Sequence, residues 1–306
     1  MKELYVVKGD PLLKYNIMNK SIGKGAVGEV FFATNKENEQ KVAIKKLQLE
    51  RRGKDRLPFI LREIEIIATS SHENIVGYIE SYEMGPELWV VMEYMSNGSL
   101  YDLVKLHSRG CKLDENLTAY AIREVTKAVH FLHCRKRIHR DIKVDNILIK
   151  NDGSVKLADF GTAVQLTFQR LRRTTLAGTP YYMAPELIQR IPYNEKVDVW
   201  SIGITVVEIM NGRPPFYELD PREALDAIVI KGVKGLTDHK QSETIKDFVN
   251  KQCLCTNPTD RATAAQLLSH PFLSNAATKE QFAKFLLQSS VMYHLEGTGS
   301  SGCTIL

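Results

Sequence analysis

Residues 139–146 read HRDIKVDN, and DFG follows at residues 159–161. Catalysis of phosphoryl transfer needs a carboxylate to orient the attacking hydroxyl, oxygen ligands for magnesium and fixed cations for the developing charge. The two motifs together contain all three kinds of group. An H-R-D-x-K-x-x-N run followed by D-F-G is a specific signature, so the pair predicts a phosphoryl-transfer site.

A glycine-rich run, GKGAVGEV at 23–30, precedes these motifs and lies between two predicted strands. Three glycines can simply serve turns, and a dinucleotide fingerprint would require a helix after the glycines. A strand follows here instead. The run therefore predicts a hairpin tip whose backbone N–H groups could fold over phosphates.

Lys45 ends the apolar run VAIK at 42–45 and lies inside a predicted strand. An unpaired ammonium is costly to bury. Lys45 either extends its side chain to solvent, as most strand lysines do, or meets a carboxylate that directs it toward phosphate.

The segment 56–69 offers that carboxylate. Ile60, Ile64 and Ile67 recur at spacings of three and four residues, which predicts a helix with one buried face. Glu63 lies along this stripe, whereas Glu65 points roughly 200° away from it. We expect Glu63 to be the partner of Lys45.

The rest of the chain predicts a sheet-rich part followed by a helical part. Residues 14–47 alternate apolar and polar side chains around turns, which indicates an antiparallel meander, and the runs IVGYIESY and ELWVVMEY predict two more strands. From about 99 to 289 the pattern is predominantly helical, with one hairpin formed by NILI and VKLA around NDGS. The change falls near residues 95–99, where SNGS supplies turn residues.

Composition excludes several classes of protein. The 306 residues are 43% hydrophobic and 25% charged with a net charge of +5, which is typical of a globular chain large enough for two lobes. The absence of a Lys/Arg tract interleaved with aromatics argues against a nucleic-acid partner. Five cysteines without paired CxxC sets argue against zinc or a disulfide framework and favour a reducing, cytosolic compartment. The longest apolar stretch, 197–210, is too short to span a bilayer.

The ordered set of motifs resembles that of the eukaryotic protein kinases, from about Tyr15 to Leu273. This resemblance implies an α+β, bilobal kinase fold: a small antiparallel β-sheet lobe with one helix (15–94) and a larger, mainly α-helical lobe (99–273). Residues 1–14 would be an N-terminal extension. Residues 274–306 would form a C-terminal helix, a flexible spacer and a candidate prenylation box.

The resemblance also implies ATP and Mg²⁺ as cofactors and assigns roles to residues. Asp141 corresponds to the catalytic base and Lys143 to the cation that neutralises the transferring phosphoryl group. Lys45, held by Glu63, corresponds to the lysine on the α and β phosphates, and Met92 to the gatekeeper before the adenine-binding hinge Glu93–Met95. The implied magnesium ligands are Asn146 and Asp159. The implied ATP-binding residues are Ile22, Gly23, Lys24, Gly25, Ala26, Val27, Gly28, Val30, Ala43, Lys45, Met92, Glu93, Met95 and Leu148.

Finer features are similar to particular groups of kinases. Lys143, together with Thr179 in GTPYYMAPE, resembles the serine/threonine pattern. GTPYYMAPE, ELWVVMEY and HRDIKVDNIL resemble the sterile-20 group, and GDP…KY at 9–15 with RATAAQLLSHPFL is most similar to the p21-activated kinases. Those kinases carry an upstream GTPase-binding segment, for which the residues before Tyr15 are too few.

Two functional alternatives follow. The first is an ATP-dependent serine/threonine protein kinase with a role in signalling. The second is a catalytically weak, membrane-anchored kinase-like scaffold, against which the intact Lys45, Asp141 and Asp159 argue. A small GTPase is excluded, because no G-x-x-x-x-G-K-[ST] occurs in the chain.

Thr175 aligns with the activating threonine of the family. Arg140 and three arginines at 170–173 form a basic cluster that a phosphate would neutralise, although a solvated basic loop is the plain alternative. Either an upstream kinase or a second copy acting in trans would phosphorylate Thr175. Because arginines stand two and three residues before Thr175, we expect protein substrates with arginine at those positions. Glu208 and Asp145 are candidates to contact them, and either could equally be structural.

Three further residues are expected to support the fold. Glu186 and Arg261 resemble the buried ion pair of the family, and Asp198 resembles the carboxylate that caps the backbone of the catalytic loop.

The chain ends SSGCTIL, with Cys303 fourth from the end. Ile305 and Leu306 fit a prenylation box, and Leu306 favours a geranylgeranyl group. Thr304 is not aliphatic, and no polybasic patch or second cysteine lies nearby to strengthen a single lipid anchor. The expectation is a cytoplasmic protein, modified by a prenyltransferase and associated with the membrane through Cys303.

Overall fold

The computed structural model describes residues 5–25, 28–51, 54–55, 57–165 and 177–296. The chain divides into two compact units, Met1–Met95 and Ser96–Leu306, which we call unit 1 and unit 2. Each unit is described by itself.

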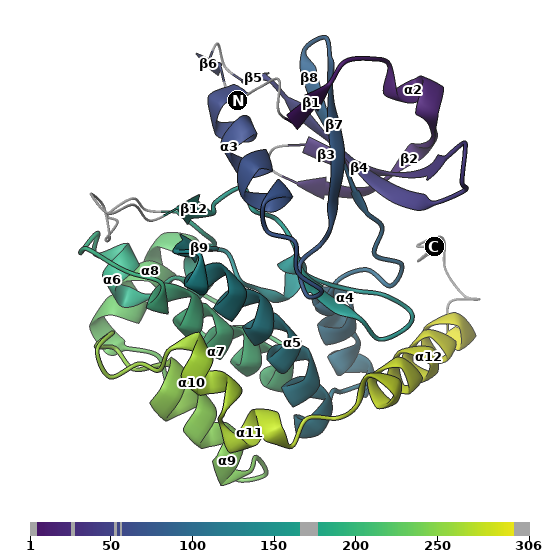
Figure 1. The fold of residues 1–306 in the computed structure, drawn as a ribbon. Helices are drawn as coiled ribbons and strands as arrows, with labels where there is room; N and C mark the ends of the chain where they lie inside the picture. Colours follow the sequence, from purple (N-terminus) through teal and green to yellow (C-terminus); the bar gives the residue numbers. More distant parts are fainter. Residues whose placement is uncertain (1–4, 26–27, 52–53, 56, 166–176, 297–306) are drawn as a thin grey trace. The chain divides into compact units, whose positions relative to one another are not determined.

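Unit 1 contains a six-stranded sheet with the strand order β1-β7-β8-β4-β3-β2 (Figure 1). All neighbouring strands are antiparallel except β1 and β7, which are parallel. The elements of the sheet are β1 (Val6–Val7), β2 (Tyr15–Gly25), β3 (Gly28–Asn35), β4 (Lys41–Gln48), β7 (Tyr78–Met84) and β8 (Glu87–Glu93). The others are α2 (Pro11–Lys14), β5 (Glu50–Arg51), β6 (Lys54–Asp55) and α3 (Leu57–Ala68).

The two faces of the sheet bury different clusters because side chains alternate along each strand. One cluster contains Tyr15, Ala33, Val42, Ile44, Tyr82, Trp89 and Val91. The other contains Leu47, Leu88 and Val90 of the sheet together with Ile60 and Ile64 of α3. The second cluster therefore holds α3 against the sheet.

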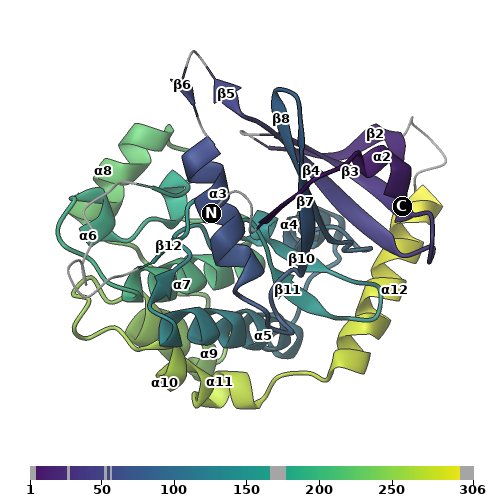
Figure 2. The ribbon, with the colours of Figure 1, turned by 45° about the horizontal axis from the view of Figure 1, so that its top comes forward.

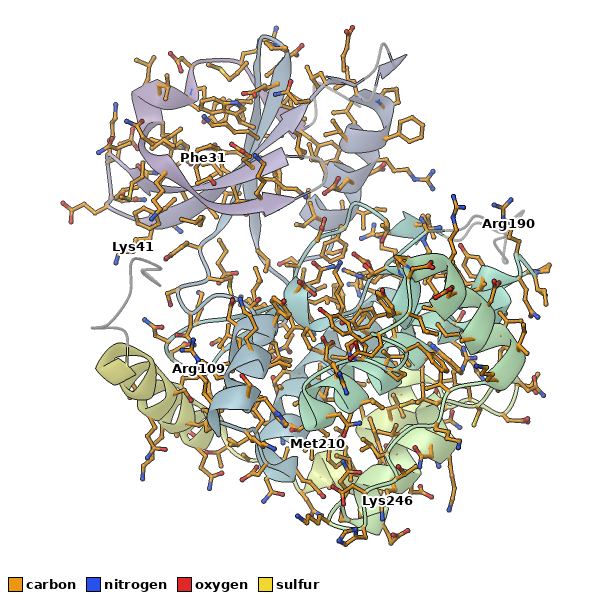
Figure 3. The ribbon with its side chains drawn as sticks, turned by 180° about the vertical axis from the view of Figure 1, so that it is seen from behind. Phe31, Lys41, Arg109, Arg190, Met210 and Lys246 are labelled. Atoms are coloured by element: carbon orange, nitrogen blue, oxygen red, sulfur yellow. The ribbon has the colours of Figure 1, made fainter. Side chains whose placement is uncertain are left out.

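The strands and the helix of unit 1 confirm the predicted antiparallel meander and the helix at 56–69. The apolar stripe of α3 is wider than predicted, because Leu61 and Ile66 are buried as well. The strand expected from Ile75 begins only at Tyr78. Lys46 Nζ lies 4.5 Å from the ring centroid of Phe31, labelled in Figure 3, and 3.8 Å from that of Trp89.

Unit 2 is mainly helical, which confirms the predicted fold class. Its α-helices are α4 (Leu100–Lys105), α5 (Glu115–Cys134), α6 (Pro185–Ile188), α7 (Lys196–Asn211), α8 (Pro221–Lys231), α9 (Glu243–Lys246), α10 (Ala264–Leu268), α11 (Pro271–Ser274) and α12 (Lys279–Glu296). Three 3-10 turns, η1 (Leu106–Arg109), η2 (Val144–Asn146) and η3 (Pro180–Tyr182), and one π-helix, η4 (Asp247–Cys253), complete the helical elements of the unit as described. Two small sheets pair β10 (Ile147–Ile149) with β11 (Val155–Leu157) and β9 (Arg137–Ile138) with β12 (Val164–Gln165).

The core of unit 2 is built on α5 and α7. Trp200 on α7 is fully buried. On α5 the predicted apolar stripe is buried from Ala121 to Leu132, whereas Leu117 is only half-buried. No helix within the described ranges is both long and apolar enough to cross a membrane.

The α12 helix lies alongside the β10–β11 hairpin (Figure 2). Lys279 Nζ contacts Asp152 at 2.8 Å, and a Cβ on Gly153 would lie 2.6 Å from the Lys279 carbonyl oxygen. Gly153 has φ +85°, so a side chain there would meet both backbone strain and a clash. The turn of the hairpin is thus held by the helix.

Candidate active site

Lys45 and Glu63 form an ion pair inside unit 1. Lys45 Nζ lies 3.1 Å from Glu63 Oε1, and the two side chains are 14% and 17% exposed. Ile60 and Ile64 of α3 pack in one cluster with Leu47 of β4. Glu63 lies between these two isoleucines in the sequence, on the face of α3 that meets β4. Glu63 was the predicted partner, and this geometry agrees with that choice over Glu65.

The predicted ATP-binding residues of the sheet share a face with Lys45. Ala43 is two residues from Lys45, and β4 pairs Ala43 with Met92 and Lys45 with Val30. Directly opposite residues on antiparallel strands point to the same side of the sheet. Val30, Ala43, Lys45 and Met92 therefore form one continuous strip.

The glycine-rich hairpin joins β2 and β3. Its strands remain paired to the tip, where Gly25 stands opposite Gly28. A Cβ on Gly28 would lie 2.0 Å from the carbonyl oxygen of Lys46, so only glycine allows β3 to approach β4 this closely. Gly23 and Lys24 belong to β2, and Ile22 is 49% exposed there. The predicted residues Ala26 and Val27 lie outside the described part of the chain.

The predicted hinge is anchored through Glu93. Its backbone N–H donates to the Gly77 carbonyl oxygen at 2.8 Å, and its Oε2 accepts from the Gly77 N–H at 3.0 Å. Met95 is buried, and Leu148 is half-buried on β10 in unit 2.

The catalytic-loop motif places Asp141 in a hydrogen-bonded network within unit 2. Asp141 Oδ1 accepts from the Thr179 N–H at 3.0 Å and from the Thr179 hydroxyl at 2.7 Å. Lys143 Nζ donates to Thr179 Oγ1 at 2.7 Å and lies 3.4 Å from Asp141 Oδ2. A carboxylate, a cation and a hydroxyl therefore meet at one point. Thr179 was used in the sequence only as a marker of the serine/threonine pattern, and its position in this network was missed.

The β10–β11 hairpin brings the two predicted magnesium ligands to one end. Asn146 directly precedes β10 and Asp159 follows β11 by two residues, while Ile147 pairs with Leu157. The Ala158 N–H donates to the Asn146 carbonyl oxygen at 2.8 Å, which closes this end. Asp159 has φ +61°, a conformation that non-glycine residues rarely adopt and that is enriched at functional sites.

These residues fit a magnesium ion by the chemistry of their donors. Asn146 Nδ2 donates to the Asp141 carbonyl oxygen at 2.8 Å and to Asp141 Oδ2 at 2.9 Å, which turns the amide oxygen away from Asp141. An amide oxygen and a carboxylate are the hard ligands that Mg²⁺ prefers, and Mg²⁺ is usually held by one or two carboxylates plus substrate phosphates. Among the residues that the structure describes, no group of three or more His, Cys, Asp or Glu side chains could hold a metal ion.

Asp198 fixes the backbone of the catalytic loop. It is fully buried and accepts from the N–H groups of His139 at 2.9 Å and Arg140 at 2.8 Å. His133 Nε2 lies 2.8 Å from Asp198 Oδ2. Burial alone would raise the pKa of Asp198, but the hydrogen bond and charge of His133, together with His139, hold it below its ordinary value. The cap was predicted, whereas the contribution of His133 was not.

The guanidinium of Arg140 makes hydrogen bonds within unit 2. It donates to the Thr162 carbonyl oxygen and, at 3.0 Å, to the Tyr193 hydroxyl, and it is only 9% exposed. Its φ of +69° is another left-handed value, stabilised by the Asp198 cap. Thr175 and the arginines at 170–173, which were expected to join Arg140, lie outside the described residues.

Glu208 and Asp145, the two candidates for contacting substrate arginines, differ in exposure. Asp145 is exposed, whereas Glu208 is 4% exposed and accepts a hydrogen bond from the Tyr182 hydroxyl. Burial raises the pKa of Glu208 to about 7; the Tyr182 hydrogen bond opposes this rise and the charge of Asp145 adds to it.

Arg261 and Glu186 form the expected buried ion pair. Arg261 Nη1 lies 2.6 Å from Glu186 Oε1, and Nη2 lies 3.1 Å from Oε2, so the pair is bidentate. Arg261 also donates to the carbonyl oxygens of Cys255 and Lys196. The predicted pairing is confirmed.

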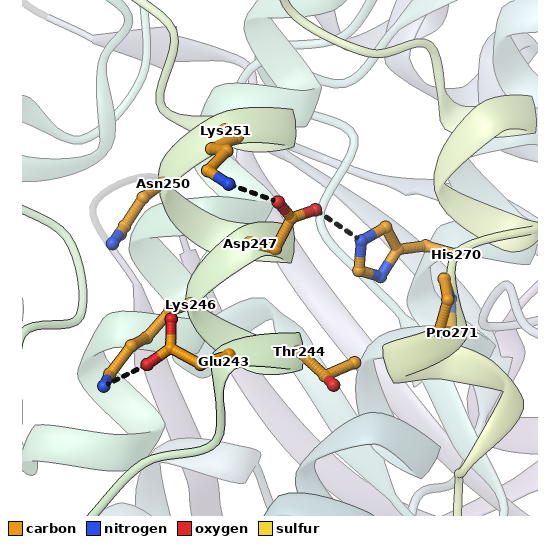
Figure 4. Close-up of a pocket in the computed structure, with 8 residues that line it drawn as sticks. All are labelled: Glu243, Thr244, Lys246, Asp247, Asn250, Lys251, His270 and Pro271. Carbon is orange, nitrogen blue, oxygen red and sulfur yellow. Dashed lines mark hydrogen bonds and ion pairs between the residues drawn. The ribbon is translucent and has the colours of Figure 1, made fainter. Parts of the chain in front are cut away.

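A separate pocket of about 450 Å³ lies on unit 2 between α9, η4 and α11 (Figure 4). Asp247 accepts from His270 at 3.1 Å and pairs with Lys251 at 3.0 Å, while Lys246 pairs with Glu243 at 2.9 Å. The first two contacts lower the pKa of Asp247 to about 2. These charged groups satisfy one another, so the pocket offers a ligand little unmatched charge.

Comparison with known proteins gives the family and the relatives to which the chain is similar. Residues 16–273 match the model of the family described as protein kinase domain. The chain is 45% identical over 287 residues to the serine/threonine-protein kinase pakC of Dictyostelium discoideum, covering 93% of this chain and 59% of that protein. It is 44% identical over 266 residues to the serine/threonine-protein kinase pak-1 of Caenorhabditis elegans, covering 87% and 45%. It is 44% identical over 272 residues to the serine/threonine-protein kinase STE20 of Candida glabrata, covering 88% and 29%. The chain thus spans 59% or less of the length of these curated relatives.

Proposed function

The chain belongs to the protein kinase family, and on that premise we propose that it transfers the γ-phosphoryl group of ATP to serine and threonine hydroxyls of proteins. The observation that carries this proposal is the network of Asp141, Lys143 and Thr179. The relatives at 44–45% identity are named serine/threonine-protein kinases, which supports the choice of acceptor.

The hydrogen bonds of Asp141 indicate which of its oxygens meets the acceptor. Oδ1 receives two hydrogen bonds from Thr179, whereas Oδ2 receives one from Asn146. A carboxylate oxygen has about two acceptor positions. Oδ2 therefore retains capacity to accept the hydrogen bond, and then the proton, of an incoming hydroxyl. Lys143, which is 3.4 Å from Oδ2, would place its positive charge beside the developing negative charge.

Each unit holds residues that the family uses to bind ATP and its metal ion. Lys45, oriented by Glu63, would contact phosphate oxygens, and Asn146 and Asp159 would hold Mg²⁺. When bound, the ion would neutralise negative charge on the phosphates. The residues of the chain keep these groups fixed before ATP arrives, which lowers the cost of ordering them.

Regulation through Thr175 belongs to the same proposal. A phosphate adds about −1.5 to −2 charge and three strong acceptors, which the arginines at 170–173 would bind. Arg140 already donates to the Thr162 carbonyl oxygen and the Tyr193 hydroxyl, so its availability to a phosphate depends on a rearrangement of these bonds. Because Thr175 follows two arginines, phosphorylation in trans by a second copy would require acceptance of Arg-Arg-x-Thr.

Substrate arginines would be drawn to Glu208 and Asp145. A guanidinium beside Glu208 would favour its charged form and thereby offset the burial that raises its pKa to about 7. Recognition through Glu208 predicts that the preference for arginine weakens as pH falls below 7. A peptide array at pH 6.5 and pH 8, with Glu208→Gln as comparison, tests this, and equal acceptance of Arg-Arg-x-Thr and Ala-Ala-x-Thr peptides would refute the arginine preference.

Radiolabel transfer from ATP to a threonine peptide tests the function itself. The wild-type chain should transfer phosphate, and Asp141→Asn and Asp159→Asn should each lower the rate by ~10²-fold or more. Asp238→Asn changes an exposed carboxylate far from these residues in sequence and should leave the rate unchanged. Absence of transfer by the wild-type chain, with ATP binding intact, would favour the kinase-like scaffold instead.

A further inference from the structure

A short strand from the N-terminal extension joins the sheet beside the helix that carries Glu63. The strand β1 (Val6–Val7) pairs in parallel with β7, placing Val6 opposite Ser81 and Val7 opposite Tyr82. It precedes the family match at 16–273. It is the edge strand of the sheet and covers only two residues of β7.

The carbonyl oxygen of Tyr5 is fixed by two side chains of β7. It accepts from the Ser81 hydroxyl at 2.6 Å and from the Tyr78 hydroxyl at 2.9 Å. Ser81 is fully buried, and Tyr78 is half-buried with its pKa raised by burial. The two hydroxyls also lie 3.0 Å apart, so without the Tyr5 carbonyl only one of them can donate to the other. The remaining buried donor would carry a desolvation cost, which favours the docked strand.

Tyr5 and Val6 also pack on the cluster that seats α3. Both side chains lie against the group formed by Leu47, Leu88 and Val90 of the sheet with Ile60 and Ile64 of α3. Ile64 is the immediate neighbour of Glu63, and Ile60 lies one turn before it. The extension therefore contacts the apolar group that positions Glu63 toward Lys45.

We propose that Tyr5–Val7 is a positioning element that holds α3 in the orientation in which Glu63 pairs with Lys45. This inference rests on the proposed function for its catalytic consequence, but its structural consequence stands alone. The element is short enough to detach without unfolding the sheet, because β7 keeps its long pairing with β8. Undocking would remove packing from the cluster that contains Ile60 and Ile64 and let α3 depart from β4, so the docked fraction of β1 sets the fraction of molecules with an intact Lys45–Glu63 pair.

Two matched substitutions test this element. Val6→Asp places a charge against the apolar cluster, whereas Leu13→Asp makes the same change in the same extension at a side chain that is 79% exposed. Val6→Ile retains the packing. A second disruptive variant, Tyr78→Phe with Ser81→Ala, removes both donors to the Tyr5 carbonyl.

Hydrogen exchange and ADP binding report the result without relying on transfer. In Val6→Asp and in the double variant, amides of α3 should exchange faster while amides of β4, β8 and unit 2 keep their rates. ADP affinity should fall, and KM for ATP should rise, by about tenfold, with KM for peptide unchanged. Leu13→Asp and Val6→Ile should match wild type. Loss of phosphate transfer in the wild type would refute the proposed function and leave the exchange result standing.

A double-mutant comparison separates positioning from general stability. Glu63→Ala removes the partner of Lys45, so adding Val6→Asp to it should cause no further loss of ADP affinity. Additive losses would overturn the proposal, as would uniform acceleration of exchange across unit 1 or wild-type exchange in α3 of Val6→Asp.

Discussion

The hydroxyl of Thr179 donates a hydrogen bond to Asp141 Oδ1 at 2.7 Å, 38 residues away in sequence. The same hydroxyl accepts from Lys143 Nζ at 2.7 Å. One threonine therefore fixes the proposed base and the proposed cation together. It also ties the catalytic loop to the segment that follows DFG.

Thr179→Val should lower kcat while leaving the fold intact. Valine preserves the shape of threonine but removes the hydroxyl between Lys143 and Asp141, and hydrogen bonds to charged groups are worth about 1.5–3 kcal/mol. We expect kcat to fall by roughly ten- to a hundredfold with KM for ATP little changed. Steady-state kinetics measure this.

Thr179→Ser is the matched control because it restores the hydroxyl and lacks only a methyl group. It should recover most of the wild-type kcat. Equal losses in the valine and serine variants would show that the methyl group, and not the hydroxyl, matters at this position.

Gly178→Ala should lower the rate of phosphate transfer, because it displaces the backbone next to the catalytic loop. Gly178 has φ +122°, and an added Cβ would lie 2.4 Å from the Arg140 carbonyl oxygen. The chain would have to move away from the catalytic loop, and a displacement of about 1 Å can cost ~10²-fold in rate. We expect such a loss in the transfer assay together with a lowered denaturation midpoint, because alanine at this φ adds backbone strain to the clash. Gly110→Ala, also at positive φ but with open space around its Cβ, is the comparison for backbone strain alone.

Arg261→Ala should destabilise unit 2. Removing one partner of a buried ion pair leaves an uncompensated charge, here Glu186, and typically costs ~3–5 kcal/mol. Chemical denaturation followed by fluorescence measures the loss. Arg213 pairs with Glu218, and both side chains are more than half exposed, so Arg213→Ala should change stability by less than about 1 kcal/mol. Equal effects of the two substitutions would contradict this account.

The parts of the site that the sequence predicted are those with local patterns. The period of Ile60 and Ile64 was sufficient to select Glu63, and the HRD and DFG motifs located Asp141, Asn146 and Asp159. The hydrogen bonds from His133 to Asp198 and from Arg140 to Tyr193 join residues 65 and 53 apart, and no local spacing indicates them. The two-residue strands β9 and β12 were missed for a related reason, since a strand that short shows no periodicity.

Glu208 should make stability fall as pH rises toward 7. Burial raises its pKa from 4.5 to about 7. The folded protein therefore binds this proton more tightly than the unfolded chain does. The stabilising contribution is complete below about pH 4.5 and is lost as pH rises through about 7, a difference on the order of 3 kcal/mol.

Denaturation midpoints of the wild type and Glu208→Gln between pH 5 and pH 8 measure this contribution. Glutamine cannot ionise and can still accept the Tyr182 hydrogen bond, so the wild type should lose stability relative to the variant across this range. Tyr182→Phe removes a hydrogen bond that lowers the pKa of Glu208, so its loss of stability should begin at the same pH as in the wild type and continue to higher pH. Parallel stability curves for all three proteins would show that folding does not raise the pKa of Glu208, so that the Tyr182 hydrogen bond and the charge of Lys143 offset the effect of burial.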